Sequence, residues 1–291
     1  MYFYKCRRIT GYFQLLGKLC AACLFGRHFY FKNMFPFLDL HFVKVPMYGL
    51  SIVLGITLAV FAGYYLCKLK NRNFYDFIII STVAIAFGFI FAKLLYIVVS
   101  YPFSQFFKTL IFTILHPREA EAASGFVFYG GLIGGILGYL AGIKIAGCSF
   151  FDFPDFYGVL IPLIHGFGRI GCFCAGCCYG IPYEGPLAVY YKNPVSSAPV
   201  GTALFPVQLL ESFLLFILAA ILFILFKKGR KFIFLIYLFS YCIIRFITEF
   251  FRFDSERGQI GILSVSQFIS ILLFAGGIII FLILKKCCRN K

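Results

Sequence analysis

The sequence predicts an all-α, polytopic integral membrane protein with seven transmembrane helices and a small external cap. Of its 291 residues, 62% are hydrophobic and 13% are charged, and 41 are phenylalanine. Soluble globular domains are about 45–50% apolar and about 25% charged, so this composition excludes that class. The apolar residues also fall into separate runs, most of them close to the ~20 residues that cross a bilayer core.

Seven such runs follow one another along the chain. They cover residues 46–67, 77–99, 126–146, 156–172, 204–226, 232–251 and 260–284. A further apolar piece, residues 110–115, is too short to cross, and we expect a re-entrant or interfacial segment there. The connection over residues 181–202, rich in proline, glycine and tyrosine, is expected to form the external cap.

The third run begins FVFYGGLIGGILG, and its glycines recur four residues apart along two faces. These glycines are Gly130, Gly134 and Gly138 on one face and Gly131 and Gly135 on the other. Small residues at this spacing let helix backbones approach closely, so we expect this helix to pack tightly against another. Tyr129, directly before the glycines, is interpreted either as an interfacial anchor or as a catalytic acid or base.

Clusters of Lys and Arg predict the orientation, because such residues are retained on the cytoplasmic side. They lie at residues 68–72, 227–231 and 285–291, which seven spans place on one side. The C-terminus is therefore predicted inside and the N-terminus outside. The net charge of +16 does not indicate a nucleic-acid partner, because these loop clusters are explained by anionic lipid headgroups.

Residues 1–33 contradict this orientation, because they carry six basic residues on the side predicted to face outward. They also lack a signal-peptide core followed by a small-residue cleavage site. We therefore interpret 1–33 as a doubtful extension, hypothesise that translation starts at Met34, and assign residues 34–291 to the seven-helix domain.

Charged residues inside the spans are candidates for function, because each costs at least ~2.5–3.5 kcal/mol on insertion scales. They are Lys93, Arg169, Glu211, Arg245 and Glu249. Arg245 and Glu249 are four residues apart and share a helical face, so the pair either only neutralises itself or belongs to an anion site. The cations outnumber the carboxylates by one, and Arg252 lies just beyond, which favours binding of a phosphate-bearing lipid.

The stretch GFGRIGCFCAGCCYG places four cysteines beside Arg169. Thiolates at this spacing suit a soft metal, but zinc sites usually combine two Cys pairs, and only Cys20 and Cys23 in the doubtful extension offer a second pair. A disulfide between residues 172 and 177 or between 174 and 178 is a second interpretation. We favour a third interpretation, in which the cysteines are small apolar lining and the arginine is the working residue.

Seven separated blocks resemble, in order, those of the prolipoprotein diacylglyceryl transferase family. They are PMYGLSIVLG, AKLLYIV, FYGGLIGG, GRIGCFCAGCCYG, FPVQLLES, IRFITEFFRFD and SVSQFIS, the last with Gln267. The chain departs from the family pattern at several of them. Tyr129 and Phe205 stand where the family has His, and Cys172, Ala175 and Cys177 where its signature has Asn, Asn and Glu. The chain thus resembles a cysteine-bearing branch of the family, and Lys93 stands where its block usually has Arg.

The resemblance implies transfer of the diacylglyceryl group of phosphatidylglycerol to the thiol of the lipobox cysteine of a preprolipoprotein in the bacterial inner membrane. A thioether forms and glycerol phosphate leaves, with no metal and no cofactor expected. Arg169 and Arg245 are implied to stabilise the phosphate, with Glu249 positioning Arg245. The residues implied to contact substrate are Tyr48, Lys93, Gly168, Gly171, Gly180, Gln208, Glu211 and Arg252.

The group that accepts the thiol proton stays open at this point. His165 lies four residues before Arg169, on the same face of a continuing helix, and Tyr129 is the positional replacement for the family histidine. Water or the phosphate itself could also take the proton, or the reaction could proceed without a dedicated base. Two different functions fit the same residues: a non-catalytic lipid- or peptide-binding protein on this fold, and a transferase with another acceptor.

Overall fold

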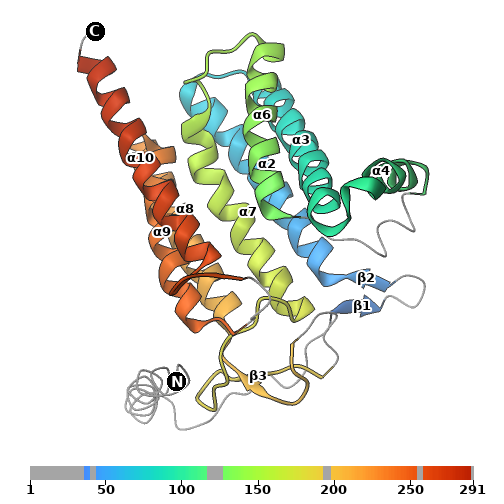
Figure 1. Ribbon diagram of the computed structural model, residues 1–291. Helices are drawn as coiled ribbons and strands as arrows, with labels where there is room; N and C mark the ends of the chain where they lie inside the picture. Colours follow the sequence, from blue (N-terminus) through green and yellow to red (C-terminus); the bar gives the residue numbers. More distant parts are fainter. Residues whose placement is uncertain (1–35, 40–43, 117–126, 193–197, 254–257, 290–291) are drawn as a thin grey trace. The chain divides into compact units, whose positions relative to one another are not determined.

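The computed structural model describes residues 36–39, 44–116, 127–192, 198–253 and 258–289 (Figure 1). Among these residues, seven helices are long and apolar enough to cross a membrane, which confirms the predicted class and the number of spans. The expectation of a translation start at Met34 concerns residues outside the described ones. The chain divides into two compact units, residues 63–154 and the remainder, which are described separately.

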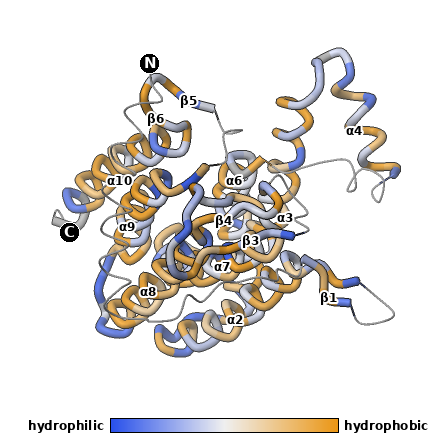
Figure 2. The backbone as a smooth tube through the Cα atoms, turned by 90° about the horizontal axis from the view of Figure 1, so that it is seen from below, coloured by the Kyte–Doolittle hydropathy of each residue, from blue (hydrophilic) through white to orange (hydrophobic). Residues whose placement is uncertain are grey.

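The first unit contains most of the polar residues singled out in the sequence. Its helices are the first part of α2 (Met47–Lys70), α7 (Pro154–Ala175), α8 (Val207–Lys227), α9 (Ile233–Thr248), the 3₁₀ turn η2 (Glu249–Phe251) and α10 (Val265–Arg289). Helix α9 packs against both α8 and α10 (Figure 1). Hydrophobic positions dominate these helices, and hydrophilic positions gather toward their ends and links (Figure 2).

Helix α7 contacts three other helices of the first unit. A Cβ atom on its Gly158 would lie 2.8 Å from the backbone of Phe234 in α9. Ser212 of α8 donates a hydrogen bond of 2.8 Å to the carbonyl oxygen of Gly166, and Gly55 of α2 packs against Phe167. The residues that follow Gly166 in α7 are therefore held among α2, α8 and α9.

Three antiparallel hairpins occur among the described residues of this unit, one before α2, one between α7 and α8 and one before α10. Strand β1 (Phe37–Asp39) pairs with β2 (Lys44–Pro46), β3 (Val189–Tyr190) with β4 (Ala203–Leu204), and β5 (Gln259–Ile260) with β6 (Leu263–Ser264). Strand β3 lies in the segment 181–202 predicted to form a cap, and β4 follows that segment directly. This hairpin has a small core of its own, made of Phe173, Val189, Tyr191, Ala198 and Leu204.

The predicted starts of the fifth and seventh spans are wrong. Leu204 lies in β4, and α8 begins only after Pro206. Residues 260–264 form the β5–β6 hairpin, which turns at Gly261 with a φ of 63°. Helix α10 then begins behind a reciprocal cap, in which the Ser264 and Gln267 side chains each accept a hydrogen bond of 3.1 Å from the other residue's amide. Apolar strand residues at a helix entrance raise hydropathy as helical ones do, which explains both errors.

The second unit contains the last part of α2, α3 (Phe74–Ser100), η1 (Phe103–Gln105), α4 (Phe106–Leu115) and α6 (Phe128–Ala146). Helices α3 and α6 pack along their length, as the glycine spacing predicts. Gly130, Gly134 and Gly138 are buried, and a Cβ on Gly134 would collide with the carbonyl oxygen of Phe87. Helix α4, which includes the predicted short segment, has 10 residues and is too short to count as a span.

We expect Gly134→Ala to destabilise the second unit, because the added methyl group meets the backbone of α3 and overpacking costs about 1–3 kcal/mol. Gly135→Ala is the matched control, since nothing lies within 4 Å of its Cβ position. The melting temperature of each variant in detergent measures the difference. Equal melting temperatures for the two variants would show that the α3–α6 contact is not as close as described.

Candidate functional site

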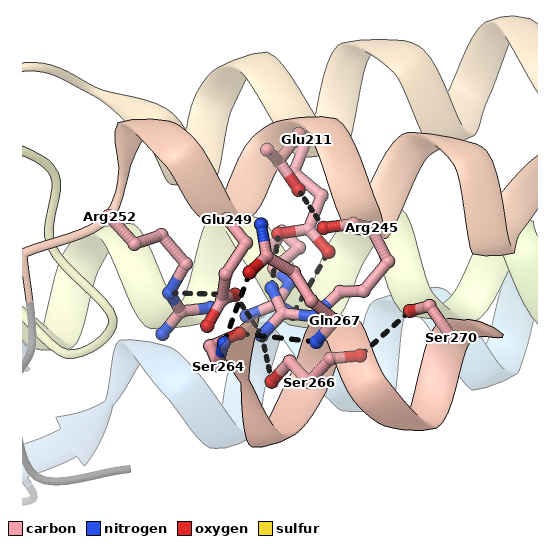
Figure 3. Close-up of polar contacts among 10 residues, drawn as sticks. Glu211, Arg245, Glu249, Arg252, Ser264, Ser266, Gln267 and Ser270 are labelled. Carbon is pink, nitrogen blue, oxygen red and sulfur yellow. Dashed lines mark hydrogen bonds and ion pairs between the residues drawn. The ribbon is translucent and has the colours of Figure 1, made fainter. Parts of the chain in front are cut away.

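The site in the first unit is a chain of alternating charges that joins three helices. Its members are Arg169 of α7, Glu211 of α8, Arg245 of α9, Glu249 of η2 and the adjoining Arg252. Arg169 Nη2 lies 2.9 Å from Glu211 Oε1, and Arg245 Nη1 lies 3.8 Å from Glu211 Oε2. Arg245 Nη2 lies 2.8 Å from Glu249 Oε2, which is 4.0 Å from Arg252 Nε (Figure 3). The spacing of Arg245 and Glu249 thus forms the ion pair that the sequence suggests.

These charges are buried, so their pairing decides whether they are tolerated. The exposed fraction of the side chain is 1% for Glu211, 3% for Arg252 and 11% for Arg169, the largest in the chain of charges. Three guanidinium groups face two carboxylates, which leaves one net positive charge. Arg169 Nε and Arg245 Nη1 are buried and make no hydrogen bond to the described residues. Glu211 Oε1 and Glu249 Oε2 likewise make no hydrogen bond to the described residues. A phosphate group would balance the net charge and carries acceptor oxygens for donors of this kind.

The first turn of α10 fixes the position of Arg245. Ser266 Oγ accepts a hydrogen bond of 2.9 Å from Arg245 Nη2, and the Ser270 hydroxyl donates one of 2.8 Å to the Ser266 carbonyl oxygen (Figure 3). The Ser264–Gln267 cap fastens the same turn. Ser266 is absent from the residues predicted from the sequence, although the SVSQ capping pattern marks the start of its helix.

Gln208, at the start of α8, contacts the turn after α7 that carries Cys177 and the segment 181–202 predicted to form the external cap. Its Nε2 atom donates a hydrogen bond of 2.8 Å to the Cys177 carbonyl oxygen and lies 3.2 Å from the Tyr191 hydroxyl. The Gln208 side chain is almost completely buried. Tyr191 is a further residue absent from the sequence predictions, because it lies in the cap, where no periodicity marks it.

Two of the predicted glycines have close neighbours. A Cβ on Gly171 would lie 3.0 Å from the ring of Tyr48 and 3.1 Å from its Cα atom, so these two predicted residues are in contact. Gly180 forms a β-bridge with Arg252, and a side chain there would collide with the Phe205 carbonyl oxygen. Gly168 has no such neighbour among the described residues, because nothing lies within 4 Å of its Cβ position.

Of the three remaining candidates, His165 interacts with Arg169, Glu211 and Arg245 of the charge chain, and the other two belong to the second unit. The His165 ring packs edge-on against Tyr241 at 5.1 Å, and the Tyr241 hydroxyl lies close to Arg169. Lys93 and Tyr129 belong to the second unit, so the described site does not include them. The Val127 amide donates a hydrogen bond of 3.2 Å to the Ala92 carbonyl oxygen, which places Lys93 and Tyr129 at the same end of the α3–α6 pair.

The cysteines after Arg169 are arranged by the C-terminal cap of α7. Gly176 has a φ of 76°, its amide donates to the Phe173 carbonyl oxygen at 3.4 Å, and the Cys177 amide donates to the Cys172 carbonyl oxygen at 3.1 Å. This is the Schellman motif, which ends helices at a left-handed glycine. Cys178 is also left-handed, with a φ of 59°. As a result the sulfur atoms of Cys172, Cys177 and Cys178 all lie within 4.8 Å of one another.

Cys174 is set apart from these three, because it packs against the hydrophobic core of the cap. All four cysteines are free thiols, so neither disulfide considered from the sequence is formed. Hydrogen bonds from the Cys172 and Cys177 thiols, with the positive charges of Arg252 and Arg169, hold the pKa of Cys178 well below its usual range. The three cysteines thus lie together beside the charge chain, with Cys178 close to Arg252 and Arg169.

Known proteins resemble this chain over most of its length. Residues 36–283 match the model of the prolipoprotein diacylglyceryl transferase family. The phosphatidylglycerol–prolipoprotein diacylglyceryl transferase of Clostridium tetani is 35% identical over 247 residues, covering 84% of this chain and 94% of the relative. Enzyme 2 of that name from Clostridium perfringens is 34% identical over 269 residues, covering 86% and 94%. The Francisella tularensis subsp. novicida protein is 28% identical over 270 residues, covering 86% and 92%.

We expect Glu211→Gln to lower the stability of the fold, because it leaves two buried guanidinium groups without their shared carboxylate. Breaking a buried ion pair from one side costs about 3–5 kcal/mol. Glu184→Gln removes the same charge from an exposed position in the cap segment and should have little effect. Unfolding of the two variants in detergent, followed by circular dichroism, measures the difference. Similar stability of both variants would show that Glu211 does not balance the arginines.

Proposed function

Because the chain belongs to the prolipoprotein diacylglyceryl transferase family, we propose that its buried arginines hold the phosphate of phosphatidylglycerol during diacylglyceryl transfer to a lipobox cysteine. The chain is a multi-pass membrane enzyme of lipoprotein biosynthesis. In the proposed reaction the cysteine sulfur attacks the glyceryl carbon next to the phosphate. The carbon–oxygen bond breaks, a thioether forms, and glycerol phosphate leaves.

The observation that carries this proposal is the surplus of one positive charge in the buried chain of ion pairs. Negative charge grows on the leaving phosphate as the carbon–oxygen bond breaks. Guanidinium groups that are already fixed in a water-poor site stabilise that charge without further reorganisation. Arg169 and Arg245 supply buried donors that make no hydrogen bond to the described residues, and Arg252 adds a third cation.

The carboxylates act in this proposal as positioning groups. Glu211 lies between Arg169 and Arg245, and Glu249 lies between Arg245 and Arg252, so each fixes two guanidinium groups at once. Their negative charges reduce the net charge of the five residues to +1, which the single negative charge of a phosphodiester matches. Gln208 is a further positioning residue, because its side chain donates a hydrogen bond to the carbonyl group of Cys177 in the cysteine-bearing turn.

Further substrate contacts are assigned by the family resemblance. Tyr48, which packs on Gly171, borders the site in the first unit, and Gly168 and Gly180 flank the signature turn. Lys93 of the second unit is proposed to contact substrate, and Tyr129 and His165 are the proposed side chains for the proton transfer. A protein that only bound lipid would have little physical reason to keep three buried guanidinium groups, although an acceptor other than a lipobox cysteine is a second candidate for the same chemistry.

We expect Arg245→Lys to reduce diacylglyceryl transfer by about 10²–10³-fold in kcat/KM, as loss of one preorganised donor does. Lysine keeps the charge but cannot reach Glu211, Glu249 and Ser266 together. Arg230→Lys, in the exposed link between α8 and α9, is the control. The assay supplies phosphatidylglycerol and a lipobox peptide to detergent-solubilised protein and measures the thioether product. Unchanged transfer by the Arg245→Lys variant would contradict the assigned role.

The orientation is a separate proposal, which places the C-terminus in the bacterial cytoplasm, the N-terminus outside and the cap segment outside. Alkaline phosphatase fused after Lys192 of the cap is expected to be active, because it folds only where its disulfides form. The same reporter fused after Arg230 or at the C-terminus is expected to be inactive. The reverse pattern of activities would show that the seven spans run the other way.

A further inference from the structure

The cluster of Cys172, Cys177 and Cys178 has the arrangement of a three-thiolate metal site. Its three sulfur atoms lie within 4.8 Å of one another. Zinc–sulfur bonds of about 2.3 Å place tetrahedral sulfur ligands about 3.8 Å apart, so a contraction of about 1 Å is the most that zinc would need. Thiolates are also the ligands that select zinc and copper(I) over harder metals.

The backbone holds these cysteines in place before any metal binds. The Schellman motif fixes Cys172 relative to Cys177 through the 3.1 Å backbone hydrogen bond. The carbonyl group of Cys177 is held in turn by the buried Gln208 side chain. Such a site needs little ordering on metal binding, which favours a defined geometry over an adventitious one.

The charge balance around the cluster also suits a metal with thiolate ligands. Three thiolates with one divalent zinc ion carry a net charge of −1, and a fourth thiolate brings it to −2. Arg169 and Arg252 both interact electrostatically with Cys178 and offset part of this charge. Within the described part of the chain, no fourth Cys, His, Asp or Glu joins the three cysteines. Zinc sites with three protein ligands are typical of catalysis, where the fourth position takes water or substrate.

We propose that Cys172, Cys177 and Cys178 bind zinc and that the thiol of the acceptor cysteine occupies its fourth position. This inference rests on the proposed transfer to a cysteine thiol, and it replaces the expectation that no metal is needed. A thiol that coordinates zinc is deprotonated outright. The metal thus supplies the thiolate in a chain that has Tyr129 at the position of the family histidine.

The reaction balances without an oxidant or a reductant. The acceptor thiol loses its proton to solvent when it coordinates zinc. Its sulfur then forms a bond to the glyceryl carbon of phosphatidylglycerol, and the carbon–oxygen bond to phosphate breaks with its electron pair on the phosphate oxygen. Glycerol phosphate leaves beside the arginines. The thioether product is neutral and a weaker ligand than a thiolate, so it dissociates and the fourth position is open again.

The binding test uses the full-length protein in detergent with a reductant, stripped by a chelator and reloaded with zinc or with cobalt(II) as a spectroscopic probe. We expect one metal ion per chain by mass spectrometry of the metal content, and thiolate-to-cobalt charge-transfer absorption. Cys178→Ser and Cys177→Ser should lose both, with melting temperatures showing that they fold. Cys174→Ser, outside the cluster, should keep both. Metal content and absorption that are identical in all three variants would overturn the site.

The ligand role of the substrate is tested by adding a lipobox peptide to the cobalt form. A peptide with its cysteine should change the cobalt spectrum, and the same peptide with serine should not. Identical spectra with the two peptides would overturn the substrate as fourth ligand. Preference for copper(I) with no binding of zinc or cobalt would overturn the catalytic zinc as well.

The pH profile separates the metal from the rest of the mechanism. A free thiol with a pKa near 8.5 is only about 3% ionised at pH 7, so stripping the zinc should slow transfer by roughly 30-fold there. By pH 9 the deficit should shrink to less than about twofold, because the free thiol ionises unaided. A stripped enzyme as active as the zinc form at pH 7 would overturn the proposal. Failure of the proposed function looks different: metal binds, but no thioether forms at any pH.

Discussion

The compensation of buried positive charge is the constraint on which the first unit depends. Three guanidinium groups lie where water cannot solvate them, and two carboxylates are arranged so that each contacts two arginines. Removing either carboxylate leaves a surplus of two positive charges in a medium of low dielectric constant, which is costlier than losing a surface pair. The same interactions therefore join α7, α8 and α9 and assemble the candidate site, so the packing of these helices and the geometry of the site depend on one set of contacts.

The ends of two helices position the other residues of the candidate site. The capping residues of α10 bring Ser266 to Arg245, and the Schellman motif of α7 brings three cysteines together. Both are local motifs of a few residues, and both lie at the end of an apolar helix. The chemistry of the site is thus concentrated at helix termini, where unpaired backbone groups and polar side chains are satisfied together.

The parts that could be predicted are those with a local pattern. Long apolar runs predict spans, glycines four apart predict the α3–α6 contact, and Arg245 and Glu249 are close in sequence. The pairing of Arg169 with Glu211 joins two helices through tertiary packing, which no local pattern contains. The strand residues before α8 and α10 are as apolar as the helices they precede, so hydropathy alone extends both spans too far.

The relative position of Cys172 and Cys177 is set by the backbone hydrogen bonds of a Schellman motif with one left-handed glycine, and the Gln208 side chain holds the Cys177 carbonyl group. These bonds do not depend on which side chains stand at the two positions, and the related signature has Asn and Glu there. Evolution can therefore exchange the donor atoms of this turn without redesigning the fold around them. The same turn can therefore present sulfur, oxygen or nitrogen atoms beside the arginines on one membrane scaffold.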